Sequence, residues 1–246
     1  HTNIAYEEIR GIDSGEGLLE LDVSMRAVVD DPSATCNAYW NGSRMNFYAE
    51  GGGCAASARI ADVVYHEYGH AVTEFTYAPI SATGTMHEGF SDYFAATIRN
   101  DPKIGNGFRG PGSSIRDIEI DRDWPDDLVG ESHADGLIIA GALWDLRKRV
   151  GREVADHLWH FARYGRSTTF DDYLLDLLVL DDDDADLFNG TPHLEEIVRA
   201  FRAHGIGDYS IDLSGAALPD VESPGVTIPV SLRIFSLVPL ESSGTA

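Results

Sequence analysis

The hydrophobic positions of the chain follow a period of two near the N-terminus and a helical period further on. Between residues 19 and 30, apolar and polar residues alternate, which is typical of a half-buried strand. The apolar positions of this stretch are Leu21, Val23, Met25, Ala27 and Val29. Residues 1 to about 55 therefore predict a small sheet.

Helical spacing dominates after residue 136. We expect helices over residues 137–150, 153–164, 170–180 and 192–204, the last with Thr191 as its N-cap and Pro192 in its first turn. A sheet-rich part followed by a helical part predicts an α+β protein.

Residues 37–48 predict a β-hairpin. Asn41-Gly42 stands between aromatic-rich arms, and this dipeptide is the strongest short-range hairpin signal. Cys36 and Cys54 flank the hairpin at its two ends, where a disulfide would clamp it. We expect the two cysteines to be bonded and the protein to be secreted, because disulfides persist in oxidising compartments. Two free buried thiols are the alternative.

A helix expected from about Ala56 to Phe75 carries the main chemical signal. Its segment His66-Glu67-Tyr68-Gly69-His70 places two imidazoles one turn apart on one face, where both can bind one metal ion. Zinc held in this way lowers the pKa of a bound water to about 7, and Glu67 is placed to take a proton from that water. Gly69 inside a helix costs about 1 kcal/mol relative to Ala, so we expect another element to pack closely there.

The third ligand expected of a catalytic zinc site is Glu88. The stretch after His70 is long enough for the first helix to end, a loop to turn near residues 79–84 and a second helix to return. Asp92 follows Glu88 by one helical turn, so we expect it to accept a hydrogen bond from His66 and fix the tautomer of that ring. His87 is the competing ligand, although its position directs it about a quarter turn away.

These segments resemble the thermolysin-like metallopeptidases and their secreted fungalysin-like relatives. The likeness lies in residues 37–48, in residues 66–76 and in Glu88-Gly89-Phe90-Ser91-Asp92. It implies a two-lobed fold with a small N-terminal sheet lobe, a central zinc-binding helix and a mainly helical C-terminal lobe. It also implies that the Asn37 side chain and the Ala38 backbone hold a peptide substrate, which fits binding by strand addition at a sheet edge.

Two further segments are similar to the same family. Residues 131–136, Glu-Ser-His-Ala-Asp-Gly, resemble the segment that carries a catalytic histidine, so His133 is expected to donate to the oxyanion. Arg116 resembles the arginine that binds the substrate carbonyl, with Arg122 as the alternative. The tyrosine that assists the oxyanion in this family has no clear counterpart here. The candidates to orient the His133 ring are Asp126, Asp127 and Asp135.

The composition of the chain excludes some classes of binding partner, and its sequence pattern suggests where its structural parts begin and end. The net charge of −23 and the lack of a basic patch argue against a nucleic-acid partner, and no apolar run has the length of a membrane span. We expect a sheet lobe with the active-site helices over residues 1–100, a helical lobe over residues 101–209 and a strand-like tail over residues 210–246.

The acidic run that begins at Asp181 suggests a calcium site, because hard cations favour several carboxylate oxygens on a short loop. Asp182, Asp184 and Asp186 are the candidate ligands. A solvated acidic connector is the alternative.

Together these patterns predict a secreted zinc endopeptidase that acts on peptide or protein substrates, with His66, His70 and Glu88 as zinc ligands and Glu67 as the general base. An N-terminal pro-segment is a further candidate partner. One alternative is a zinc exopeptidase of the aminopeptidase kind, which needs a fixed partner for a peptide terminus. The other is a non-catalytic, calcium-dependent binding module with a structural metal. Glu67 argues against it, since such a site does not need a base beside its ligands.

Overall fold

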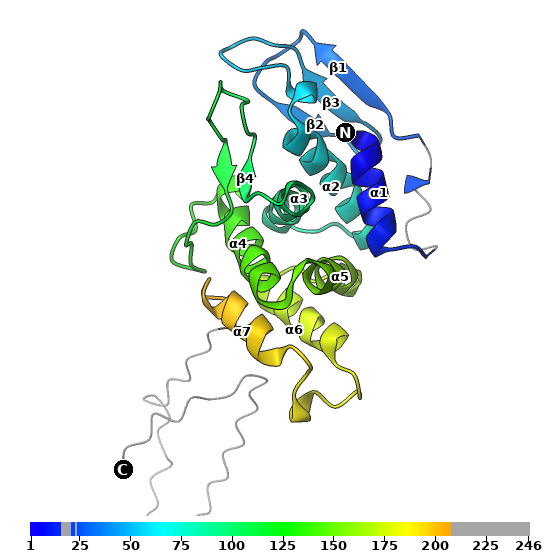
Figure 1. Ribbon diagram of the computed structural model, residues 1–246, viewed down its shortest axis with the longest axis vertical. Helices are drawn as coiled ribbons and strands as arrows, with labels where there is room; N and C mark the ends of the chain where they lie inside the picture. The colour runs from blue at the N-terminus through cyan, green and yellow to red at the C-terminus, as the bar shows by residue number, and fades with distance from the viewer. Residues whose placement is uncertain (16–20, 23, 208–246) are drawn as a thin grey trace, which may run out of the picture.

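The computed structural model describes residues 1–15, 21–22 and 24–207, which form an α+β protein (Figure 1). A small three-stranded sheet lies at one end of the molecule, and the helices of the C-terminal half lie toward the other. Two helices between these parts carry the predicted metal ligands.

The first residues form a helix, α1 (Thr2–Ile12), where the sequence predicted sheet. Its buried residues Ala5 and Ile9 are four positions apart and so lie on one face of the helix. The prediction of a sheet rested instead on the alternation of residues 19–30, which does not extend to these first residues. The strand predicted over residues 19–30 was also too long. Among its described residues, only those from Ala27 onward lie in β1 (Ala27–Asp31). The remainder of the prediction, over residues 19, 20 and 23, lies outside the described residues.

The predicted hairpin is confirmed. Strands β2 (Ala38–Trp40) and β3 (Met45–Tyr48) are antiparallel, and β1 pairs with the other side of β3 in parallel. In the turn, the Asn41 side chain accepts backbone hydrogen bonds from Ser43 and Arg44, and Gly42 has the positive φ of 85° that glycine adopts without strain. The sheet order is β1-β3-β2, so β2 is an edge strand among the described residues.

Helices α2 (Ala61–Tyr77) and α3 (Gly84–Arg99) cross the middle of the protein. The helix expected from Ala56 begins later, at Ala61, and a short 3-10 helix over Ser57–Arg59 precedes it. The close packing expected at Gly69 is confirmed, because a Cβ there would lie 3.0 Å from the Cα of Ser91 in α3. The two helices can therefore approach closely enough for their side chains to share one site.

The C-terminal half is helical, as expected, and is built around α4 (Ser132–Val150). All residues of α4 from Asp135 to Trp144 are buried, and this helix packs against α3, α5 (Arg152–Ala162) and α7 (Leu194–Arg202). Contact with α3 depends on glycine, since a Cβ on Gly89 would lie 2.5 Å from the carbonyl oxygen of Gly136.

The last predicted helix begins later than expected, at Leu194. Thr191 does not cap it, because its hydroxyl donates to Oδ2 of Asp181 at the end of α6 (Phe170–Asp181), at 2.7 Å. A short antiparallel pair, β4 (Lys103–Ile104) and β5 (Arg116–Asp117), connects α3 to α4.

The division of the chain near residues 100 and 209 stays a prediction, and the tail over residues 210–246 lies outside the described residues. Within the described part of the chain, no helix combines the length and the apolar character that a bilayer span requires.

Candidate active site

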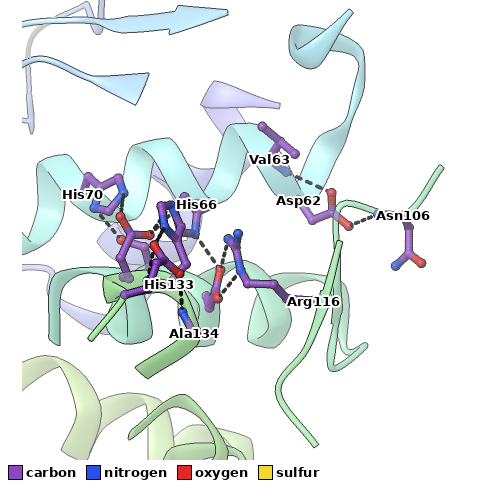
Figure 2. A network of polar contacts seen from close by, with 12 residues as sticks. Asp62, Val63, His66, His70, Asn106, Arg116, His133 and Ala134 are labelled. Carbon is purple, nitrogen blue, oxygen red and sulfur yellow. Dashed lines mark hydrogen bonds and ion pairs between the residues drawn. The ribbon is translucent and has the colours of Figure 1, made fainter. Parts of the chain in front are cut away.

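The three predicted metal ligands converge. His66 and His70 project from α2, and Glu88 projects from α3, so that one ligand atom of each lies within 4.8 Å of the others. Nε2 of His66 lies 3.1 Å from Oε2 of Glu88, and Nε2 of His70 lies 3.7 Å from its Oε1. Figure 2 shows both imidazoles on one side of α2.

These distances fit zinc. Two imidazoles and one carboxylate form a donor set of catalytic zinc sites, and ligand atoms about 2.1 Å from a tetrahedral ion lie about 3.4 Å from one another. The spacings of 3.1 and 3.7 Å stand on either side of that value. His66, His70 and Glu88 can therefore hold a zinc ion without a large rearrangement.

Asp92 lies against the His66 ring. Its Oδ1 lies 2.7 Å from Nδ1 of His66, and the Asp92 side chain is completely buried. Arg116 donates two hydrogen bonds of 2.7 Å to the same carboxylate, one from Nε and one from Nη2. The sequence predicted that the Arg116 guanidinium group binds a substrate carbonyl. In the structure this group binds Asp92, and the Arg116 side chain also lines the cleft.

Charge around this cluster determines how its groups ionise. Burial raises the pKa of Asp92, but Arg116 and His66 lower it well below its ordinary value. Burial lowers the pKa of His66, but Asp92 and Glu88 raise it to about 10, so an ion that binds Nε2 displaces a proton. Burial also raises the pKa of Glu88, and the neighbouring imidazoles bring it down to about 2.

His70 has two polar neighbours that the sequence analysis did not identify. Its Nδ1 lies 2.9 Å from Nδ1 of His87 and 3.1 Å from Oγ of Ser91, while its Nε2 faces Glu88. His87, considered above as a competing ligand, therefore contacts the far side of a ligand ring. Burial lowers its pKa to about 4, which favours a neutral imidazole.

Glu67 lies beside the ligands in an enclosed position. Its residue is 5% exposed, and its Oε2 has no hydrogen-bond partner among the described residues. Burial raises the pKa of Glu67, the charge of His66 lowers it and that of Glu88 raises it, with a result of about 7. A carboxyl group with this pKa can take up and release a proton near neutral pH.

His133 approaches the ligands from the start of α4, where Figure 2 shows it close to His66. Its Nε2 lies 3.4 Å from Oε2 of Glu88. Its Nδ1 lies 2.6 Å from Oε1 of Glu131, which also accepts the backbone hydrogen bond of His133 and, through Oε2, that of Ala134. Glu131 thus caps α4 and orients the imidazole at the same time.

None of the three aspartates expected to orient His133 is its partner. Asp135 accepts backbone hydrogen bonds from Val129 and Gly130 instead. Asp127 accepts one from the Asp123 backbone, and no contact joins Asp126 to the His133 ring. The helix predicted from the sequence began at Leu137, whereas α4 begins at Ser132, so the capping position of Glu131 lay outside the predicted helix.

The ligands lie in a cleft of about 520 Å³ between the edge strand, α2, α3 and the segments around β5 and the start of α4. Asn37 and Ala38 line it, as the resemblance implies. Val63, Ile104, Phe108 and Ile115 give another part of it an apolar wall.

Hydrogen bonding in the hairpin leaves the main chain of Ala38 directed at the open edge. Asn41 donates to the Arg44 carbonyl and Tyr48 donates to the Asn37 carbonyl, so these two pairs carry bonds between the strands. Bonded and non-bonded pairs alternate in an antiparallel ladder, and Ala38 pairs with Phe47 between them. The N–H and C=O groups of Ala38 therefore point away from β3.

Cys36 and Cys54 form the predicted disulfide, with their Cα atoms 5.2 Å apart. The acidic run is exposed in large part, and carboxylate oxygens of Asp182, Asp183 and Asp184 lie within 4.8 Å of one another. Asp186, expected to complete a calcium site, donates its backbone N–H to Asp184. Calcium binding stays a prediction.

This chain is similar to known proteins in its sequence and in its fold. Residues 8–74 match the family model described as thermolysin metallopeptidase, catalytic domain, a stretch that includes His66, Glu67 and His70 and ends before Glu88. Bacillolysin of Brevibacillus brevis is 32% identical over 119 residues, which are 46% of this chain and 22% of the relative's length. The precursor of protealysin, a metalloproteinase from Serratia proteamaculans, has a similar fold with a TM-score of 0.69 at 17% identity, covering 83% of this chain and 76% of that one.

Proposed function

We propose that this chain, which is thermolysin-like in its N-terminal sequence and in its fold, is a zinc-dependent endopeptidase. The observation that carries the proposal is the convergence of His66, His70 and Glu88 beside a buried Glu67, in an open cleft. A structural zinc site is closed by four protein ligands, whereas this arrangement has three within the described part of the chain, with a candidate general base next to them.

When bound, zinc supplies a water of lowered pKa and a positive charge that polarises the scissile carbonyl. Glu67 takes a proton from the attacking water and passes it to the leaving amine. Its pKa of about 7 suits both transfers, because a base that must also act as an acid works best near the ambient pH.

His133 stabilises the negative charge that develops on the peptide oxygen. Glu131 holds the ring through Nδ1, which lies 2.6 Å from its Oε1, and this leaves Nε2 as the ring atom that faces the substrate. The position of Nε2, 3.4 Å from Glu88, supports this role because it brings the donor next to the metal ligands.

The substrate is an extended peptide that adds to the edge strand β2. The outward N–H and C=O of Ala38 support this mode, since strand addition uses main-chain groups whatever the peptide's sequence. Asn37 adds a side-chain partner at the same edge. The apolar wall formed by Val63, Ile104, Phe108 and Ile115 favours a hydrophobic substrate side chain next to the cleaved bond.

Secretion, a pro-segment and calcium belong to the same proposal. The disulfide supports an oxidising compartment, and the similarity to a protease precursor suggests that a pro-segment accompanies this catalytic part. An endopeptidase is favoured over an exopeptidase because the main-chain groups of an edge strand recognise internal residues as well as ends.

The test is hydrolysis of a peptide blocked at both ends, measured together with the zinc content of the protein. We expect cleavage that a chelator abolishes and zinc restores. Glu67→Gln should keep its zinc and lose at least about 100-fold in kcat, with exposed Glu153→Gln as the control. Full activity of Glu67→Gln, or cleavage only of peptides with a free terminus, would contradict the proposal.

A further inference from the structure

The disulfide forms part of the wall of the cleft. Cys36 lines the cleft and directly precedes Asn37 and Ala38, the residues proposed to hold the peptide. Its partner Cys54 is 5% exposed and lies in the segment that leads into α2. The covalent bond therefore connects the beginning of the edge strand to the chain just before the helix of the metal ligands.

The same connection continues to another part of the cleft. Ala55, the residue after Cys54, donates its backbone N–H to the carbonyl of Phe108 at 2.8 Å. Phe108 is buried and, with Arg109, lines the cleft within the loop between β4 and β5. One disulfide, one peptide bond and one hydrogen bond thus join the edge strand to the loop that contributes to the apolar wall.

Backbone hydrogen bonds hold the start of the edge strand only weakly, although Ala38 packs against the hydrophobic core. β2 has three residues and pairs on one side alone among the described residues, and the bond from Tyr48 to the Asn37 carbonyl is long, at 3.4 Å. A strand of three residues with a partner on one side has few hydrogen bonds to keep its position, so a covalent bond at its end adds a constraint. Here the fixed end is Cys36.

The chain is shaped to bring the two cysteines together. Cys54 follows Gly51-Gly52-Gly53, and a Cβ on Gly51 would lie 2.6 Å from Cγ2 of Thr35. A Cβ on Gly52 would lie 3.2 Å from the Cys36 sulfur. Because side chains there would push the segments apart, the glycine run permits the close approach that the bond requires.

We propose that the Cys36–Cys54 disulfide is a positioning device that holds the peptide-binding edge strand and the loop of residues 105–113 in register, so that its reduction weakens peptide binding while the zinc ligands stay in place. The inference rests on the proposed function. Cys36 is partly exposed, so a reductant can reach the bond. A dithiol breaks it by two exchange steps, in which the reductant is oxidised to its own disulfide and Cys36 and Cys54 each gain one electron and one proton.

The experiment compares the wild-type protein with Cys36→Ser/Cys54→Ser by steady-state hydrolysis of a doubly blocked peptide and by zinc analysis. We expect KM to rise about tenfold, with kcat within twofold of wild type and unchanged zinc content. A merely structural bond would not separate KM from kcat in this way. A KM within twofold of wild type, or a loss of kcat together with zinc, overturns the inference.

Hydrogen exchange measured by mass spectrometry tests the coupling independently of activity. In the double variant, and in folded wild-type protein reduced by a dithiol and alkylated, residues 36–40 and 105–113 should both exchange faster, while α4 stays protected. Unchanged exchange of residues 105–113 in the reduced protein overturns the inference even if the variant does not fold. If the wild-type protein cleaves no peptide, the proposed function fails, and the exchange result still decides whether the disulfide couples the two segments.

Discussion

The Oδ1 atom of Asp92 lies 2.7 Å from Nδ1 of His66, one of the three candidate zinc ligands. The Nε2 atom of the same ring faces Glu88, and Arg116 donates two hydrogen bonds to the buried carboxylate. One buried acid thus connects a candidate metal ligand with a cation from β5, so the geometry of the site depends on elements that are distant in the sequence.

Asp92→Asn should weaken zinc binding by about 10- to 100-fold, because the amide removes the charge that raises the basicity of His66. Zinc affinity measured by competition with a chelator gives this number. Glu119→Gln, which removes a carboxylate from an exposed ion pair with Lys148, is the control and should bind zinc like wild type. Equal affinities in all three proteins would show that Asp92 does not tune the ligand.

Glu131 and His133 should act as one unit. His133→Ala is expected to lower kcat by about 100-fold or more, as the loss of an oxyanion donor does, and Glu131→Gln by about tenfold. In the His133→Ala background, Glu131→Gln should cause little further loss, because its effect passes through the ring. Steady-state kinetics of the four proteins tests this, and additive losses would argue for separate roles.

His160 should make stability depend on pH. The ring is fully buried between Asp13, which lies 3.0 Å from Nε2, and Arg163, which donates to Nδ1 at 2.8 Å. Arg163 can only donate, so the proton of the neutral ring is on Nε2. Burial and the charge of Arg163 lower the pKa of His160 to about 3, against about 6.5 in an unfolded chain.

Between these pH values the unfolded chain binds a proton that the folded protein does not, so the free energy of unfolding rises with pH. The slope from this residue approaches about 1.4 kcal/mol per pH unit, and its contribution is complete above about pH 6.5. Asp13, whose pKa is lowered by its hydrogen bond from His160 despite burial, also loses stabilisation as the pH falls. Urea denaturation from pH 4 to 7.5 measures the total.

His160→Gln removes the titration and should show a flatter dependence on pH, with a loss of about 2 kcal/mol at pH 7 because the amide does not reproduce the ring's hydrogen bonds to both Asp13 and Arg163. His157→Gln on the exposed side of the same helix is the matched control. A constant difference between His160→Gln and wild type at every pH would rule out this origin of the acid sensitivity.

Gly89→Ala should destabilise the protein by about 3 kcal/mol or more, because the added Cβ would lie 2.5 Å from the Gly136 carbonyl oxygen and 2.3 Å from the Ile139 side chain. Gly11→Ala is the matched control, since Gly11 is in α1 and a Cβ there meets nothing within 4 Å. Its helix propensity should instead stabilise by up to about 1 kcal/mol. Thermal unfolding of both variants checks the prediction, and equal effects would mean that the contact between α3 and α4 can relax.

Features that depend on short sequence distances were accessible from the sequence alone. Two histidines one helical turn apart, an acid one turn before another acid, and Asn41-Gly42 in a hairpin each determine a local geometry through backbone periodicity. For this reason the ligand set, the edge strand and the helices after residue 136 were predicted close to their observed positions. The helix of the first twelve residues was missed, because its few buried positions were outweighed by the alternation further along the chain.

Only the tertiary structure decided which partner each site residue has. Glu131 rather than an aspartate contacts His133, His87 and Ser91 contact His70, and Arg116 binds Asp92. Several acidic and basic residues lie near each site residue in the sequence, and their spacing alone does not show which of them forms the contact. The choice follows from how closely α2, α3 and α4 pack at their glycines, since side-chain contacts between helices depend on differences of about one ångström that local periodicity does not determine.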